Sequence, residues 1–381
     1  MMLMIMPNNL TLRIAARLRL RCKRRWCCNV ASCSSIITQS LSGDICAATT
    51  SAFQSVAAHS RAFGTSTSSS SSSPLHVFDR RVKRLQRDWA AKQAHFNLFQ
   101  YLKSEAAYRV ADKVYDCMDF FDVAVDLGCG AGWIAPHVFK ENVGCLVQLD
   151  MSEQMVARSA ASEDVLTIRL VADEECPPLR SASVDLFMSS LSLHWVNNLP
   201  ALFVRCFEYL RADGAFVMSL FGGDTLYELR CSLQLAEQER LGGMAPHVSP
   251  FVQAQDLAGL MSRAGFQMLT VDTDQMVVNY PDMASLLVDL QGMAENNATV
   301  VRSPHLRKSV IIAASAIYKE MYGNDDELRS VPATFQLINL IGWKPGPKMP
   351  KPARRGSQTA SFQDLGRLTE QLLTGKKESA D

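Results

Sequence analysis

Three glycines at alternate positions, Gly128, Gly130 and Gly132, follow a short apolar run that ends in Asp126. Glycine lets the backbone turn tightly and approach a bound molecule closely, because it has no side chain in the way. We expect a helix to begin directly after this loop at Trp133, so that its first backbone amides point at a ligand. The residue types and their spacing therefore predict a binding site for a polar small molecule at the end of a strand.

Two further acidic side chains end apolar runs that have the length of strands. Asp150 follows the run 145–149 and could accept hydrogen bonds from both hydroxyl groups of a ribose. Alternatively, it caps the helix predicted after it, a role that Ser152 could also take. Asp173 follows the run 166–171 and could accept a hydrogen bond from the exocyclic amine of adenine, unless it is a solvated loop residue. The predicted cofactor site comprises Asp126, Gly128, Gly130, Gly132, Asp150, Met151, Asp173 and Ser190.

The spacing of the glycines separates two classes of nucleotide-binding loop. The fingerprint for dinucleotides requires its third glycine at the position of Trp133 in this chain. An acidic residue two positions before the first of three alternating glycines instead resembles the S-adenosylmethionine loop of class I methyltransferases. S-adenosylmethionine is therefore the predicted cofactor.

Candidate catalytic groups follow the fourth and fifth predicted strands. Tyr227 and Arg230 lie three residues apart and so share one face of a helix predicted over 226–240. On that face they could clamp a carboxylate or guide a polar substrate, or they could belong to an ordinary surface helix. His194 is either a general base, because histidine titrates near neutral pH, or a packed, hydrogen-bonded core residue beside Trp195.

No metal site is predicted. The chain contains no His-x-Asp pair, so the sequence signature of an iron site with two histidines and one carboxylate is missing. Six cysteines lie beyond residue 73, scattered and without any C-x-x-C spacing, which predicts neither a zinc site nor a disulfide framework.

The segments that carry these residues alternate between strand and helix. Such alternation predicts βαβ units and an α/β, doubly wound sheet, in which ligands bind beyond the carboxyl ends of the strands. Strands are predicted at 123–126, 145–149, 166–171, 184–188, 215–220 and 335–341. Helices are predicted at 151–160, 199–210, 226–240, 256–264, 281–290 and 305–321.

Additions flank this predicted domain, which spans 121–343. The segment 74–120 is predicted to be a helical cover, because apolar residues recur at spacings of four, three and four. Its apolar stripe comprises Phe78, Val82, Leu85 and Trp89. On the C-terminal side, a hairpin over 268–272 and 275–279 is predicted to return to the sheet, and the segment 344–381 is predicted to be a basic, largely disordered tail.

The charge of the chain is unevenly spread. The 381 residues carry 39 basic and 38 acidic side chains, a balance that argues against a general nucleic-acid binder. Residues 1–76 nevertheless hold eight basic residues and one acidic residue, and they are rich in serine. This composition is typical of a mitochondrial transit peptide, predicted at 1–73, whereas a secretory signal would need an apolar core that is missing. The alternative is a disordered tail without a targeting role.

Long runs beyond the leader resemble a known family. The chain is similar, over roughly 75–376, to mitochondrial assembly factors of complex I (NADH:ubiquinone oxidoreductase) that hydroxylate a protein arginine, within the class I methyltransferase-like superfamily. The runs that carry the resemblance are DLGCGAG, VADEE, SSLSLHWVN, FGGDTLYELRCSLQLAE, DLQGM, VPATFQ and IGWK.

The resemblance implies more than the residues themselves. It implies action in the mitochondrial matrix, peripherally on the inner membrane, on an arginine of the PSST-type iron–sulfur subunit in early assembly intermediates. Hydroxylation needs an oxidant and electrons, which S-adenosylmethionine does not bring, and the sequence identifies no source of either.

Two alternatives from other functional classes stay open. The runs SSLSLHW and TLYELR also resemble the malonyl-carrier-protein methyltransferase, which predicts transfer of a methyl group to a carboxylate, a protein or a small molecule. The other alternative is a non-catalytic assembly chaperone that binds S-adenosylmethionine only for stability.

Overall fold

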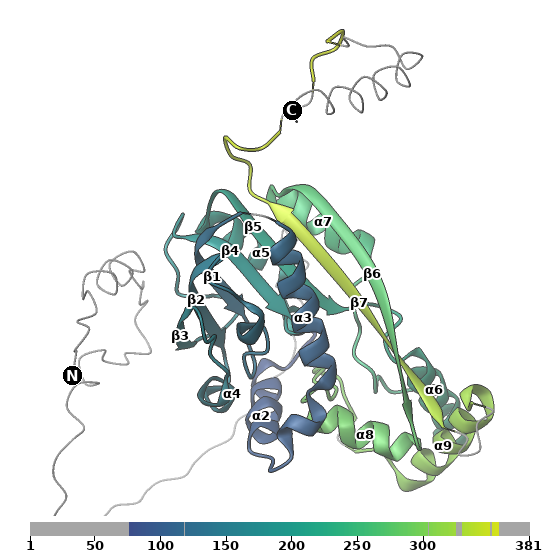
Figure 1. The fold of residues 1–381 in the computed structure, drawn as a ribbon. Helices are drawn as coiled ribbons and strands as arrows, with labels where there is room; N and C mark the ends of the chain where they lie inside the picture. The colour runs from purple at the N-terminus through teal and green to yellow at the C-terminus, as the bar shows by residue number, and fades with distance from the viewer. Residues whose placement is uncertain (1–75, 118, 304, 325–329, 351–352, 358–381) are drawn as a thin grey trace, which may run out of the picture.

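One seven-stranded sheet organises the protein in the order β3-β2-β1-β4-β5-β7-β6 (Figure 1). The computed structural model describes residues 76–117, 119–303, 305–324, 330–350 and 353–357. The predicted transit peptide at 1–73 and the end of the predicted tail lie outside these residues. The strands are β1 Phe121–Leu127, β2 Val143–Asp150, β3 Leu166–Val171, β4 Val184–Ser190, β5 Leu210–Phe221, β6 Gln267–Tyr280 and β7 Val331–Trp343.

The pairing of the strands confirms the predicted doubly wound α/β fold. Neighbouring strands from β3 to β5 are all parallel, whereas β7 pairs antiparallel with both β5 and β6. The chain order reverses between β1 and β4, and this reversal opens a crevice beyond the carboxyl ends of these strands. The predicted cofactor residues lie at that edge.

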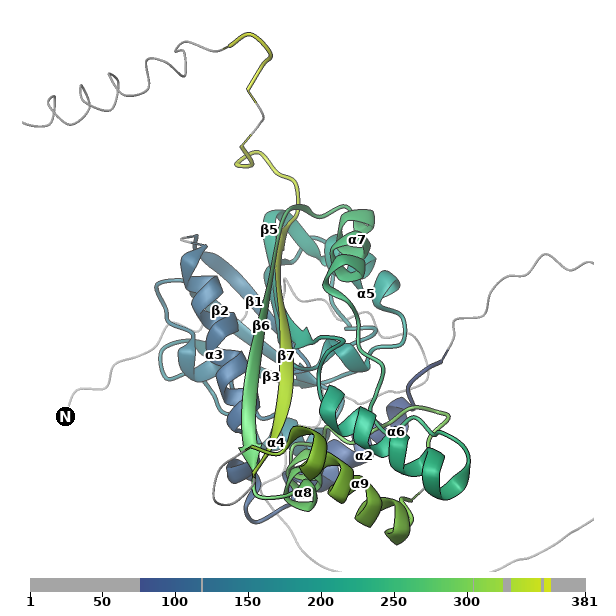
Figure 2. The same cartoon turned by 90° about the vertical axis from the view of Figure 1, so that its right-hand side faces the viewer.

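Helices cover both faces of the sheet (Figures 1 and 2). On one face α3 packs against β4 and β5, and on the other α5 packs against α7. The α-helices are α2 Arg80–Ala91, α3 Tyr101–Asp116, α4 Glu153–Arg158, α5 Leu199–Tyr209, α6 Tyr227–Leu241, α7 Ala254–Ala264, α8 Met283–Gly292 and α9 Lys308–Tyr322.

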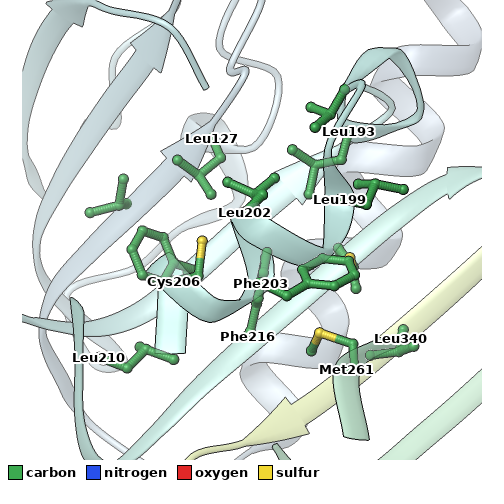
Figure 3. Packing of buried hydrophobic residues seen from close by; sticks show 14 of the residues in the cluster. Leu127, Leu193, Leu199, Leu202, Phe203, Cys206, Leu210, Phe216, Met261 and Leu340 are labelled. Carbon is green, nitrogen blue, oxygen red and sulfur yellow. The ribbon is translucent and has the colours of Figure 1, made fainter. Parts of the chain in front are cut away.

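A core of leucine and phenylalanine side chains fixes α5 on the sheet (Figure 3). Phe203 of α5 meets Phe216 of β5 at a ring distance of 6.0 Å, in an edge-to-face arrangement. Leu202 and Leu210 in the same cluster are fully buried. Burial of each such side chain contributes about 1.5–3 kcal/mol, so this layer holds β1 and β4 in the positions that the site requires.

The strands β6 and β7 extend well past the parallel strands and carry a second core (Figure 1). The lower half of β7, with Phe335 and Leu337, packs among side chains of α6, α8 and α9. The upper half, with Ile338 and Leu340, belongs to the core below α5. One strand therefore ties the two cores together.

The predicted hairpin over 268–279 is wrong, because this segment forms the single strand β6. A tight hairpin needs residues that accept a positive φ at its turn, such as Asn-Gly, and the middle of the segment offers Thr273 and Asp274 instead. Asp274 pairs with Arg109 of α3 at 2.9 Å, so the strand continues along the sheet edge.

One helical prediction fails, and a second is only half right. No α-helix follows the glycine loop, where only a 3₁₀ turn forms at Ala135–His137, because ten residues between Gly132 and β2 are too few for a crossover helix. The predicted apolar stripe is half right: Phe78 is buried and Val82 packs against its cluster, but Leu85 and Trp89 of α2 are exposed. The buried face of α2 instead carries Lys83 and Arg87, whose partners are carboxylates and carbonyls elsewhere in the chain.

Candidate functional site

The glycine loop turns back on the end of β2. The amides of Gly128 and Cys129 both donate to the carbonyl of Leu149, at 2.7 and 2.9 Å. A Cβ atom at Gly128, where φ is +70°, would lie 1.9 Å from Oγ of Ser192, whereas one at Gly130 would meet nothing within 4 Å. The loop therefore needs glycine at 128 for close packing and leaves open space at 130.

A narrow recess of about 20 Å³, room for about one water molecule, lies against this loop. It collects five of the predicted cofactor residues from the ends of β1, β2 and β4: Asp126, Gly128, Gly130, Asp150 and Ser190. Its remaining lining includes Arg87, Gln100, Lys103, Trp133 and Met155.

Three buried polar groups in the recess have no hydrogen-bond partner. These are both carboxylate oxygens of Asp126, Oγ of Ser190 and Nε1 of Trp133. Burial, and next the nearby charge of Asp150, raise the pKa of Asp126 to about 8. Unpaired buried polar groups are costly, so their convergence in one recess fits a polar ligand that brings complementary donors and acceptors.

Asp150 is fully buried and bound on several sides. It accepts hydrogen bonds from the amides of Gly130 at 3.0 Å and Ser152 at 2.8 Å. Ser152 itself caps α4 by accepting from the amide of Met155, so the predicted capping role belongs to Ser152. Arg87 lies 3.1 Å from the Asp150 carboxylate, and a ribose would have to share that carboxylate with it.

Arg87 and Glu174 are site residues that the sequence interpretation missed. Arg87 donates to Glu174 and, at 2.8 Å, to Oγ of Ser192. Burial alone would raise the pKa of Glu174, but the charges of Arg80 and Arg87 lower it to about 2. Arg80, Lys83 and Arg87 recur at helical spacing in α2, so the sequence shows this cationic stripe but not that it is buried.

The other predicted cofactor residues lie outside the lining of the recess. The side chain of Asp173 is 52% exposed and pairs with Arg80 at 2.8 Å. Gly132 packs against Gln148 and Ala160, where a Cβ would collide. Met151 directly follows β2 and is partly buried.

The structure does not bring Tyr227 and Arg230 to the recess. The ring of Tyr227 meets Tyr322 of α9 edge to face at 5.9 Å. Arg230 donates to the carbonyls of Gly223 and Thr225, which belong to the loop before its own helix. Both side chains thus contribute to the contacts around α6.

His194 is a buried residue with one bound and one free nitrogen. Its Nε2 lies 3.1 Å from Glu295, while its Nδ1 has no partner. Burial lowers the pKa of this imidazole, an effect that Glu295 opposes. The ring also packs against Phe221 and Phe251, so His194 is a packed, hydrogen-bonded residue of the protein interior.

Among the residues that the structure describes, no cluster of three or more His, Cys, Asp or Glu could hold a metal ion. The recess offers carboxylates, a hydroxyl and an indole N–H at the switch point of the sheet. Such groups can orient a nucleoside cofactor and exclude water from its reactive end.

Known proteins resemble the chain over this region and beyond it. A family model described as a methyltransferase domain matches residues 125–218, which run from β1 to β5. The arginine-hydroxylase NDUFAF5, mitochondrial, of Rattus norvegicus is 50% identical over 311 residues, which are 81% of this chain and 90% of the relative. Its namesake from Homo sapiens is 49% identical over 309 residues, with 81% and 89% coverage.

A more distant likeness joins the chain to a methyltransferase. The malonyl-[acyl-carrier protein] O-methyltransferase of Gallionella capsiferriformans (strain ES-2) is 26% identical over 237 residues, 59% of this chain and 78% of that protein.

Proposed function

The chain belongs to the family of mitochondrial arginine-hydroxylases with a methyltransferase-like fold, and on this premise we propose that it hydroxylates an arginine of the PSST-type iron–sulfur subunit of complex I. The similarity extends over 81% of this chain and nine-tenths of the rat relative, so it includes the glycine loop and the helical segment before it. The proposed reaction takes place on early assembly intermediates.

The recess supports binding of S-adenosylmethionine. Asp126, Ser190 and Trp133 are its buried groups without partners, and they would bind the polar end of the cofactor. Asp150 lies beside Gly130 and would accept hydrogen bonds from ribose. S-adenosylmethionine, when bound, supplies a methyl group activated by a sulfonium charge, which demands alignment and desolvation rather than acid–base catalysis.

Hydroxylation itself requires a further reactant. Insertion of one oxygen atom into a C–H bond needs an oxidant and a source of electrons. The sulfonium of S-adenosylmethionine supplies neither, so the proposal includes a co-reactant of that class. The residues of the recess would then orient the cofactor and keep water away from the substrate.

The proposed location is the mitochondrial matrix, on the matrix face of the inner membrane. The related hydroxylases are named as mitochondrial proteins, and the composition of 1–73 favours import. No helix among the described residues has the length and hydropathy of a membrane span. The association with the membrane that we propose is peripheral.

A methyltransferase is the second candidate, supported by the likeness to the malonyl-[acyl-carrier protein] enzyme. Methyl transfer would use the same recess without any oxidant. The third possibility, a chaperone without catalysis, would use it for stability alone.

Mass spectrometry of the PSST-type subunit distinguishes these functions. We expect the subunit from mitochondria that contain this chain to carry one added oxygen atom on an arginine, and the subunit from mitochondria that lack it to be unmodified. Re-expression of the wild-type chain restores the oxygen. An added methylene group would support the methyltransferase, and an unchanged mass would support the chaperone.

A further inference from the structure

A second cavity, of about 350 Å³, lies between α6 and α8. One side of it is apolar, with Leu229 and Leu233 of α6 facing Leu287 and Leu290 of α8. Its polar lining includes Glu295, Asn296 and Arg302 in the segment after α8, and His247 in the loop after α6. The volume is that of an ordinary ligand pocket, and no predicted cofactor or catalytic residue lines it.

The polar part of this cavity presents acceptors for a cationic group. The Glu295 side chain is 7% exposed, and its Oε1 lies 3.1 Å from Nζ of Lys103. Its Oε2 accepts from Nε1 of Trp195 at 2.9 Å and lies 3.1 Å from Nε2 of His194, so a bound guanidinium would share this carboxylate with them. Although burial alone would raise the pKa of Glu295, Lys103 and His194 lower it far below its usual range, so this carboxylate is ionised. Oδ1 of Asn296 is buried and has no partner in the structure.

The apolar walls suit the stem of a long cationic side chain. Arginine and lysine bury their methylene groups against apolar surfaces while their charged heads reach polar groups. A guanidinium carries five N–H donors in a planar fork and can bridge a carboxylate and an amide oxygen at once, whereas an ammonium is a compact point charge. The leucines together with Glu295 and Asn296 therefore favour arginine.

The second cavity adjoins the glycine-loop recess through one ion pair. Lys103 lines the recess, Glu295 lines the second cavity, and the pair joins the two at 3.1 Å. A group bound at Glu295 would therefore lie directly behind the wall of the cofactor site.

We propose that this second cavity binds the side chain of the substrate arginine, with its stem along the leucines of α6 and α8 and its guanidinium at Glu295 and Asn296. This inference rests on the proposed hydroxylase function, because that function supplies the identity of the cationic side chain.

The main competing ligand is an anion held by Arg302, which also lines the cavity. Arg302 already donates to the carbonyl of Thr299 at 2.8 Å and lies 3.6 Å from Asp79. Arg302 thus already has two partners, whereas the Asn296 acceptor has none. The observations favour a cation.

Calorimetry with two small probes tests the proposal on the full chain. N-acetyl-L-arginine methylamide carries the guanidinium, and N-acetyl-L-citrulline methylamide has nearly the same shape without the charge. We expect the arginine probe to bind at least about tenfold more tightly, as befits hydrogen bonds between charged groups. Equal affinity for the two probes, or tighter binding of the citrulline probe, would overturn the assignment.

Neighbouring substitutions on α8 locate the binding. Leu287→Trp fills the cavity, while Val288→Trp is its control, because Val288 is 57% exposed and lies outside the lining. We expect Leu287→Trp to abolish binding of the arginine probe and Val288→Trp to retain it, with melting temperatures that verify folding. If Leu287→Trp fails to fold, Asn296→Leu replaces it and is expected to weaken the arginine probe about tenfold. Wild-type affinity in a folded cavity variant would refute the site.

The outcomes separate this inference from the proposed function. If the arginine probe binds and Leu287→Trp blocks it, but the PSST-type subunit carries no added oxygen, the cavity is supported and the hydroxylase function fails. If the subunit is hydroxylated equally by wild type and Leu287→Trp, the function stands and the cavity assignment fails.

Discussion

At the scale of single residues, two carboxyl groups at and near the recess have pKa values shifted in opposite directions. Asp126 has a pKa raised to about 8, with burial as the main cause, whereas Glu174 has a pKa lowered to about 2 because two arginines face it. Asp126 is therefore largely protonated at neutral pH and can donate as well as accept a hydrogen bond. In the free protein the buried, unpaired carboxyl group of Asp126 lowers stability, and hydrogen bonds to a bound cofactor would offset this loss.

The cost at Asp126 predicts a pH-dependent gain in stability for Asp126→Asn. The folded state favours the protonated acid, so the stability contribution of Asp126 is complete below the unfolded pKa near 4 and is lost as pH rises through about 8. We expect urea unfolding to show Asp126→Asn gaining stability over wild type between pH 4 and pH 8, by up to about 5 kcal/mol. Asp112→Asn, at an exposed position of α3, is the control, and a gain independent of pH would contradict the assignment.

Asp150 gives a second prediction at this scale. Asp150→Ala removes the proposed ribose acceptor at the end of β2, and we expect S-adenosylmethionine binding to weaken by about 1–3 kcal/mol. Titration calorimetry measures the change, with Asp112→Asn again as the matched control. Unchanged affinity would remove Asp150 from the cofactor site.

At the scale of secondary-structure elements, α2 is fastened to the sheet by buried charges. Lys83 donates to the carbonyls of Ala294 and Asn296, both at 2.9 Å, and lies 3.3 Å from the centre of the Trp195 ring. Arg80 and Arg87 bind Glu174 from one side of the helix. These contacts hold Arg87 against Asp150 in the lining of the recess.

The ion pairs between Glu174 and the arginines of α2 should weaken in acid. The pKa of Glu174 is lowered in the folded state, so its contribution is present above the unfolded pKa near 4.3 and is lost as pH falls through about 2. We expect wild type to lose about 3 kcal/mol of unfolding free energy across this window in urea titrations. Glu174→Gln should be less stable than wild type at pH 6 and should lack this loss. A loss of the same size in Glu174→Gln would show that another group is responsible.

At the scale of the whole molecule, β7 joins two hydrophobic cores. Its residues Ile338 and Leu340 belong to the core under α5, whereas Phe335 packs 5.8 Å from the ring of Phe221 in the core beside α6, α8 and α9. The second cavity is built on the latter core. Folding of the parallel sheet and formation of that cavity are therefore coupled through a continuous strand.

This coupling predicts a single unfolding transition even when only the second core is damaged. Phe335→Ala should lower the unfolding free energy by about 3–5 kcal/mol, because the ring is almost fully buried. Far-UV and near-UV circular dichroism should report the same lowered midpoint. Two separated transitions would show that the second core unfolds independently of the sheet.

Much of the fold was predictable from local patterns. The bounds of β3 agree with the prediction, and Asp126, Asp150 and Ser190 lie at the ends of β1, β2 and β4 as expected. Parallel strands in a doubly wound sheet end at one edge, so short apolar runs followed by polar residues determine where a ligand site lies. The proposed hydroxylation came instead from the resemblance to a known family, which rests on long runs of residues.

The sequence by itself thus determined the glycine loop, the strand ends and the family, because each depends on residues that are close together in the chain. Only the tertiary structure decided the environment of α2 and the partners of Glu295. Arg87 and Glu174 are 87 residues apart in sequence, and Lys103 and Glu295 are separated by far more. No periodicity within one helix reveals that its cationic face is buried, since the carboxylates that neutralise this charge arrive from distant segments.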